Sequence, residues 1–228
     1  MKNMYKLALL AAVGLVSITS AQAQYNQGDL LVGFTTGSGN DLIYDIGSAS
    51  SLTQGESWNL ASLLTGNLST IANDSWGVIG VTPGAYNAGT STIFTTASGS
   101  NVGALGSIGK NQFKAAITDV GTIGLDFSST SKSAYDAASD GNSWNSQANG
   151  STGFAADTTN PNATGVATQT FYTEQSTGLG QDSFFSLGST GTLTFGTAVS
   201  VPEPATYGLL SGAGMLLLGL RRQLSRKS

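Results

Sequence analysis

Length, composition and charge restrict the chain to a few classes of protein. Its 228 residues carry 9 basic and 13 acidic side chains, a net charge of −4, and neither cysteine nor histidine. The lack of these two residue types excludes disulfides, imidazole general bases, Ser-His-Asp triads and histidine-ligated zinc or copper.

The first 23 residues are predicted to be a secretory signal peptide. Two lysines precede an apolar run over residues 7–18, and Ala21-Gln22-Ala23 has the small-x-small pattern of a cleavage site. We expect signal peptidase to recognise Ala21 and Ala23, so that the mature chain begins at Gln24. A permanent N-terminal membrane helix is the alternative, and the shortness of the run argues against it.

Residues 24–200 have the length of one domain with a sizeable core. This region carries only three basic side chains, Lys110, Lys114 and Lys132, against twelve acidic ones, which gives a net charge of −9. An acidic domain repels phosphate backbones, so nucleic acid is not expected as a partner. Small polar residues replace charged ones, as is common in exported β proteins.

In chain order, the first elements predicted are strands. Residues 29–34 and 42–46 are expected to form a hairpin around a turn at 35–40. Ser57 is expected to cap a short helix that carries Trp58 and Leu64 on one side. Further strands are predicted at 75–81 and 91–96.

The strongest helix pattern covers residues 108–120. Phe113, Ala116, Ile117 and Val120 share one helical face, and Gly121 is expected to end the helix.

Residues 128–165 are mostly small and polar, and they predict a long surface excursion that Trp144 and Phe154 attach to the core. A strand is expected at 165–174, and a final hairpin is expected from 183–187 and 192–195.

The predicted fold class is therefore mainly β with one or two short helices, apart from a signal helix and a C-terminal membrane helix. A β-sandwich is the first choice, and a strongly curved antiparallel sheet covered by the helices is the second.

Residues 201–228 form a tail with three parts. Pro202-Glu203-Pro204 is followed by an apolar run over 205–220 and then by Arg221-Arg222 and further basic residues. The run corresponds to about 24 Å of helix, short for a bilayer core of about 30 Å, so the arginines are expected to reach the cytoplasmic headgroups. The acidic domain then lies outside. A permanent C-terminal anchor is the alternative.

The tail resembles the PEP-CTERM sorting tail of bacterial exported proteins. The resemblance implies that an exosortase, a membrane-embedded protease, recognises the region of Pro202, Glu203 and Pro204 and removes the tail, including the basic cluster of Arg221 and Arg222. The mature protein would then reach the cell envelope or the exopolysaccharide layer. Residues 28–34 and 40–47 also resemble exported PEP-CTERM proteins, without an implied activity, and we expect a structural or adhesive protein that is not an enzyme.

A carbohydrate-active module is the alternative from a different class. A glycosidase needs two carboxylates on opposite sides of a sugar, for which Asp41 with Asp45, or Glu174 with Asp182, are the candidates. Aromatic side chains can also stack on sugars, as suits a module that binds exopolysaccharide, and Trp144 is the candidate for such a contact.

No cofactor is predicted, although calcium remains compatible with a chain that offers only oxygen ligands. Residues 37–43 resemble one turn of the calcium-binding nonapeptide repeat, but a single copy favours a plain hairpin loop. Asp136, Asp140 and Asn142 are the second candidate cluster, and they lack the glycine and distal glutamate of an EF-hand.

Overall fold

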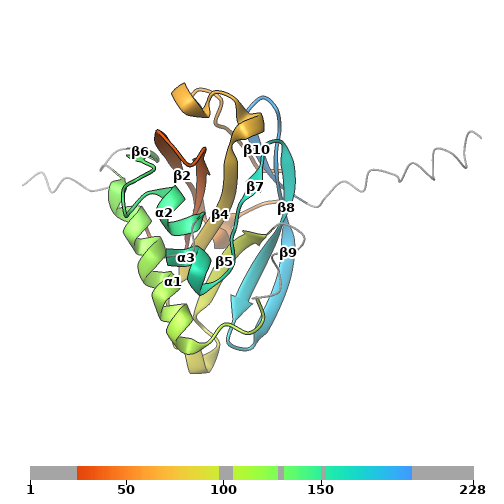
Figure 1. The fold of residues 1–228 in the computed structure, drawn as a ribbon. Coiled ribbons are helices and arrows are strands. Elements are labelled where there is room, and N and C mark those ends of the chain that lie inside the picture. The colour runs from red at the N-terminus through yellow and green to blue at the C-terminus, as the bar shows by residue number, and fades with distance from the viewer. Residues whose placement is uncertain (1–24, 98–104, 128–130, 150–152, 197–228) are drawn as a thin grey trace, which may run out of the picture.

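One ten-stranded sheet dominates the computed structural model, which describes residues 25–97, 105–127, 131–149 and 153–196 (Figure 1). Across the sheet the strands lie in the order β3 (Ser57–Asn59), β10 (Thr192–Gly196), β9 (Gly178–Leu187), β8 (Ala167–Gln175), β5 (Thr92–Ala97), β4 (Ser75–Thr82), β1 (Asp29–Thr35), β2 (Asn40–Ser48) and β6 (Ser133–Ala137). A short strand, β7 (Ala163–Thr164), pairs with one end of β4. All these pairs are antiparallel.

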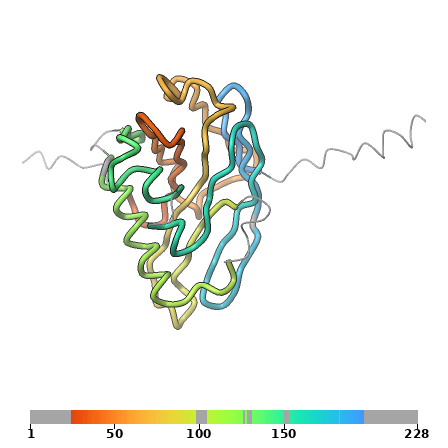
Figure 2. Tube along the Cα trace, in the orientation of Figure 1, coloured from red at the N-terminus to blue at the C-terminus, as the bar shows by residue number. Residues whose placement is uncertain are grey.

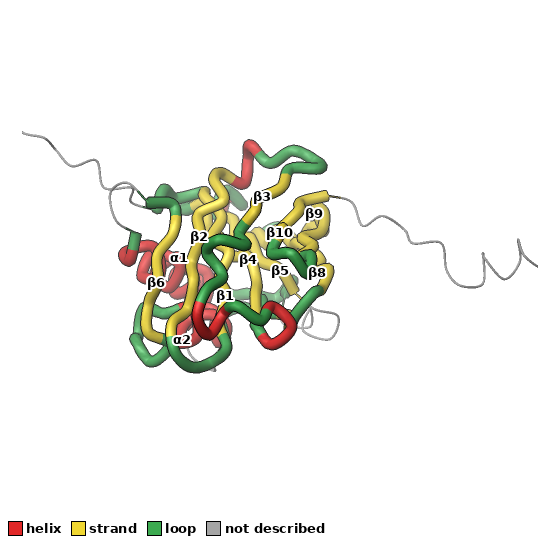
Figure 3. The backbone as a smooth tube through the Cα atoms, turned by 90° about the horizontal axis from the view of Figure 1, so that it is seen from above, coloured by secondary structure: helices red, strands yellow, loops and turns green. Residues whose placement is uncertain are grey.

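The sheet is strongly curved, which is the second of the two predicted architectures. In Figure 3 the strand labels run from β6 on the left through β2 and β4 to β8 and β9 on the right. The predicted hairpins are confirmed, because β1 pairs with β2 and β9 pairs with β10. Figure 2 shows these two hairpins, red and blue, in separate parts of the molecule. A sandwich of two separate sheets is not observed, because the hydrogen-bonded order is continuous from β3 to β6.

Two clusters of buried side chains, one on each face of the sheet, form the core. The helix-side core includes Leu31, Ile43, Ile79, Phe113 and Val120. The inner core includes Val32, Phe34, Trp76, Phe185 and Leu193. Successive side chains of β1 pack in different clusters, so this strand is buried on both faces. Its sequence is therefore a continuous apolar run. The inner core joins β1, β2 and β4 to β8, β9 and β10, which wrap around it.

Three α-helices of the described residues lie on one side of the sheet (Figure 1). The longest, α1 (Lys110–Ile123), confirms the predicted helix, and its apolar face is buried. The prediction that Gly121 ends this helix is wrong, because α1 continues past it to Ile123. The other two helices, α2 (Trp144–Ala148) and α3 (Gly153–Asp157), have five residues each.

Two sequence predictions about local structure are wrong. Residues 57–59 form strand β3 and not the start of a helix, because Trp58 pairs with Leu193 of β10 and the ladder satisfies its backbone. Residues 128–165 are not a surface excursion, since they contribute β6, α2, α3 and β7. The prediction that Trp144 and Phe154 attach this segment to the core is confirmed, because both side chains are fully buried.

A pair of glycines allows the helices to approach the sheet closely. Gly33 of β1 pairs with Gly77 of β4. A Cβ atom on Gly33 would lie 1.8 Å from Cδ2 of Trp144, and one on Gly77 would lie 2.5 Å from the carbonyl oxygen of Pro161. Only glycine fits at these two positions, because the indole ring of Trp144 and the backbone of Pro161 occupy the space that a side chain would need.

Both edges of the sheet are short strands. The edge strand β3 has three residues and covers part of β10, while β6 has five residues and covers Asn40 to Tyr44 of the nine-residue β2. The outermost strands are therefore short, whereas residues 178–183 of β9 extend beyond β10 and pair, among the described strands, with β8 alone.

The predicted signal peptide at 1–23 and the predicted membrane helix at 205–220 lie outside the described residues. Within the part of the chain that the structure describes, no helix has the length and apolarity needed to cross a membrane.

Candidate functional site

The residues predicted to direct sorting and cleavage lie outside the described part of the chain: Ala21, Ala23, Pro202, Glu203, Pro204, Arg221 and Arg222. The described chain begins at Tyr25, in the helix-side core, and ends just after Phe195, in the inner core. The two ends of the described chain therefore enter different faces of the sheet.

Asp41, the first member of one predicted glycosidase pair, is buried. Its exposed fraction is 0%, and its Oδ2 accepts a 2.6 Å hydrogen bond from the backbone N–H of Asn145 in α2. Burial raises its pKa, and this hydrogen bond opposes the rise. Its predicted partner Asp45 accepts a hydrogen bond from the N–H of Gly47. Asp41 holds the start of α2 against β2 and is not accessible to a sugar.

Glu174, a member of the second predicted pair, is also buried, with an exposed fraction of 2%. Its Oε2 accepts a 2.6 Å hydrogen bond from the N–H of Gly106, a few residues before α1. The carboxylate thus fixes the segment that leads into this helix. The side chain of its predicted partner, Asp182, is not among those that the structure describes.

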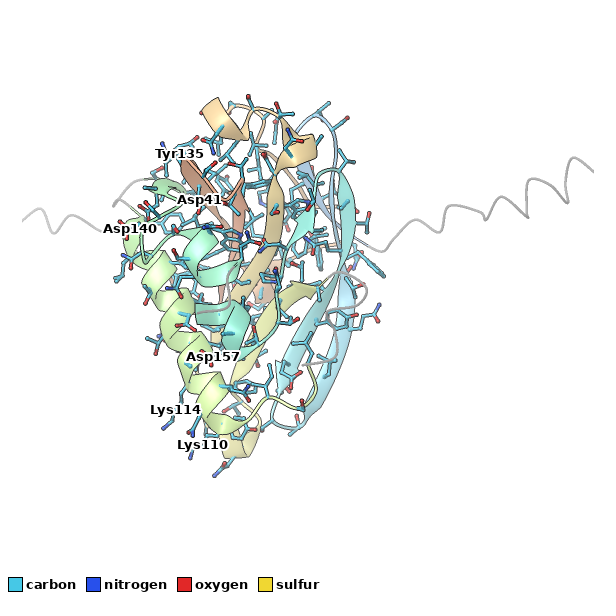
Figure 4. The ribbon with its side chains drawn as sticks, in the orientation of Figure 1. Asp41, Lys110, Lys114, Tyr135, Asp140 and Asp157 are labelled. Carbon is cyan, nitrogen blue, oxygen red and sulfur yellow. The ribbon has the colours of Figure 1, made fainter. Side chains whose placement is uncertain are left out.

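A carboxyl pair that sequence reasoning missed joins α1 to α3. Asp119 and Asp157 lie close enough to interact, and burial together with the charge of Asp157 raises the pKa of Asp119 to about 6. Figure 4 shows Asp157 on α3 beside α1. No sequence signal could have found the pair, because α3 was predicted to be loop.

A second unusual carboxyl group is Asp74, directly before β4. Its exposed fraction is 0%, and neither side-chain oxygen has a hydrogen-bond partner among the described residues. Burial raises its pKa to about 6. The protonated form is therefore favoured in the folded protein over a wider pH range than in the unfolded chain.

The prediction that Trp144 contacts a sugar is wrong. The side chain is fully buried in the helix-side core, and its Nε1–H donates a 2.9 Å hydrogen bond to Oδ1 of Asn162. The amide of Asn162 donates in turn to the carbonyl of Ala148. Trp144 therefore ties α2 to the segment before β7.

Residues 37–39 form the turn between β1 and β2, and residues 40–43 begin β2. The side-chain amide of Asn67 lies against this loop, and its Nδ2 donates to Thr36 Oγ1 and to the carbonyl oxygens of Ser38 and Asn40. Its Oδ1 accepts from the N–H of Asn40. An amide group thus bridges the oxygen atoms that converge there.

The second candidate calcium cluster has mainly local hydrogen bonds. Asp136 accepts from the N–H of Ala137, and Asp140 accepts from the N–H of Asn142. Among the residues with described placement, no group of three or more acidic side chains is arranged to hold a metal ion.

Two pockets lie along α1 and share Ile117; we call them together the α1 groove. The first, of about 290 Å³, lies between α1 and the loop after β4, and it is lined by Tyr86, Ser91, Lys110 and Lys114 among others. The second, of about 310 Å³, lies between the end of α1 and the first described residues, including Asn26 and Gln27.

Hydrogen bonds and ring packing fix the walls of the α1 groove. The hydroxyl of Tyr86 donates to the carbonyl of Ile108, 2.9 Å away, just before α1. Its ring meets Phe113 edge-on, with centroids 5.0 Å apart. At the other pocket, the hydroxyl of Tyr25 exchanges hydrogen bonds with the backbone of Val81. The groove is therefore largely formed before any ligand binds.

The comparisons with known proteins identify the tail alone. The family model of the PEP-CTERM protein-sorting motif matches residues 200–223. This confirms the sequence prediction of a PEP-CTERM sorting tail, which in general marks a protein for export, C-terminal membrane anchoring and processing by an exosortase. The comparison with curated proteins and the comparison with solved structures found no match.

Proposed function

We propose that the chain is the precursor of a structural or adhesive protein of the cell envelope or extracellular matrix. In this proposal signal peptidase removes residues 1–23, the tail holds the precursor in the inner membrane, and an exosortase cuts near Pro202–Pro204. The curved β domain is the part that remains outside the cell. The match of the sorting motif to residues 200–223 is the observation that carries the proposal.

A role without catalysis is supported by the positions of the predicted catalytic carboxylates. Asp41 and Glu174 are buried, and each accepts a short hydrogen bond from a backbone N–H. A glycosidase needs its two carboxyl groups on either side of a bound sugar ring. Groups that fix the start of α2 and the approach to α1 are better suited to stabilising the fold.

Intact-mass measurement on the protein recovered from the surface of its native cells tests the sorting step. The expected mature chain begins at Gln24 and ends near Pro202–Pro204. A surface protein that retains the basic residues 221–227 would refute processing and favour a permanent anchor.

A pair of variants makes this test specific. Glu203→Ala is expected to leave the unprocessed precursor in the membrane fraction, because it removes the only charged residue of the Pro-Glu-Pro segment. Thr197→Ala, a few residues before the motif, is the matched control and should be processed like the unchanged chain. Equal processing of both variants would contradict recognition at this segment.

A further inference from the structure

We propose that the α1 groove binds a segment of an acidic polysaccharide, with a sugar carboxylate held by Lys110 and Lys114. This binding site is independent of the sorting tail and goes beyond a passive structural role.

The local charge of the groove is the first argument, because its two lysines form a cationic patch on a domain whose net charge otherwise repels polyanions. Of the three lysines in the region from 24 to 200, whose net charge is −9, two line the first pocket. Figure 4 shows both near the lower end of α1. The third, Lys132, lies near Asp45; burial raises the pKa of that carboxyl, and the charge of Lys132 opposes part of the rise. No carboxylate of the described residues lies within 4.0 Å of the ammonium groups of Lys110 and Lys114.

Helix stability does not explain these two lysines. They are four residues apart on α1, a spacing at which like charges repel. Lys110 is also the first residue of the helix, where the macrodipole disfavours a cation. An anionic group placed between the two ammoniums would relieve both effects and form charge-assisted hydrogen bonds.

The second argument is a hydroxyl group in the first pocket that is available for a hydrogen bond. Ser91 lines it with an exposed fraction of 2%, and its hydroxyl has no hydrogen-bond partner among the described residues. The hydroxyl can therefore bond to water or to a ligand in the pocket. The hydroxyl or carboxylate of a sugar supplies such a partner.

The shape of the groove indicates a polymer. Its two pockets extend from Lys110 to Gly124 along α1, and the rise over these residues is about 21 Å. The lysines lie at one end, Ile117 in the middle, and the amides of Asn26 and Gln27 at the other end. Apolar surface beside neutral amides suits the C–H faces and hydroxyls of successive sugar rings.

A peptide fits this groove less well than a sugar chain. An extended peptide gains most of its affinity by pairing with an exposed strand edge, and the α1 groove is walled by a helix and loops. A helical peptide needs a continuous apolar groove, which the lysines and amides interrupt. An acidic peptide is therefore kept as a competing outcome of the experiment.

Calorimetric titration of the full-length chain, purified in a non-ionic detergent, tests the proposal. The probes are a hexamer of galacturonic acid, a neutral galactose hexamer and a hexaglutamate peptide. We expect the galacturonate hexamer to bind, and the other two probes to bind at least about tenfold more weakly, a difference of about 1.4 kcal/mol. Raising the salt concentration from about 20 to 200 mM should weaken the interaction, because the ammonium groups are exposed.

Three variants assign the binding to this groove. Lys110→Gln/Lys114→Gln should weaken galacturonate binding at least about tenfold, and Ser91→Ala should weaken it by a smaller factor. Lys132→Gln is the matched control, because it removes a lysine away from the groove, and it should change affinity less than about twofold. Thermal unfolding of each variant checks that the fold is retained.

Two kinds of result would overturn the proposal. The absence of galacturonate binding, or an equal loss in Lys132→Gln and in the double lysine variant, would overturn the proposal. Binding of hexaglutamate as tightly as galacturonate would assign the groove to acidic peptides and overturn the sugar. None of these results bears on sorting, which is determined from the mass of the mature chain.

Discussion

The contact between Trp144 and Gly33 should be measurable as a coupling free energy. Trp144→Ala removes a fully buried indole, which typically costs about 3–5 kcal/mol. It also leaves Oδ1 of Asn162 without its donor, at about 1 kcal/mol more. Gly33→Ala places a methyl group 1.8 Å from Cδ2 of the indole, an overlap that should cost about 1–3 kcal/mol.

The double variant distinguishes a direct contact from two independent losses. When the indole is absent, the methyl group at position 33 enters the space that the indole occupied and no longer clashes. The free energy of unfolding should therefore fall by about 2 kcal/mol less than the sum of the two single effects. Urea unfolding of residues 24–200, followed by circular dichroism, gives the four values.

Gly121→Ala provides the control for this cycle, because a Cβ at that position would meet nothing within 4 Å. Combined with Trp144→Ala, its effect should be additive within about 0.5 kcal/mol. A coupling of zero between positions 33 and 144, or a loss below about 1 kcal/mol for Trp144→Ala, would refute burial of the indole against the sheet.

Three further predictions concern stability. Gly121→Ala alone should raise the free energy of unfolding by about 0.5–1 kcal/mol, because alanine replaces glycine inside α1 without a clash; a loss of stability would contradict this placement. Burial raises the pKa of Asp74 from 3.8 to about 6, so the folded state binds a proton that the unfolded chain releases between these two pH values. The contribution of this proton to the free energy of unfolding is complete below about pH 4 and is lost as the pH rises through 6. The free energy of unfolding should therefore fall by about 2–3 kcal/mol more between pH 4 and 7 in the unchanged chain than in Asp74→Asn, and parallel pH profiles would exclude the effect. Asn67→Ala should cost about 1–2 kcal/mol and accelerate amide hydrogen exchange in residues 36–40, whose loop the side chain bridges; unchanged exchange would show that the loop holds itself.

Elements with a strong local pattern were predictable from the sequence. The apolar spacing of α1 and the alternating residues of β10 identify a helix and a strand without knowledge of their partners. The helix predicted from Ser57 is not observed, because residues 57–59 form β3 by pairing with β10. This partner lies far along the chain, and local propensity carries no information about it.

The prediction of a surface excursion at residues 128–165 was wrong for a similar reason. The small polar residues of this segment are typical of loops, yet α2 is capped by Ser143 and by the distant carboxylate of Asp41. Trp144 was considered for contact with a sugar because its neighbours are polar, whereas its complete burial depends on the absence of a side chain at Gly33. The α1 groove likewise combines three segments that are distant in sequence, whereas the sorting tail is contiguous and was therefore recognisable.

The short edge strands bear on how the protein behaves when many copies are crowded together. An open strand edge is a template onto which another chain can add, and repeated addition leads to fibres. Here the outermost strands, β3 and β6, offer only three and five residues, and the domain also carries a net negative charge. Neighbouring copies therefore meet only short outermost strands, and residues 178–183 of β9, which extend beyond β10, are the stretch at which strand addition would have to begin.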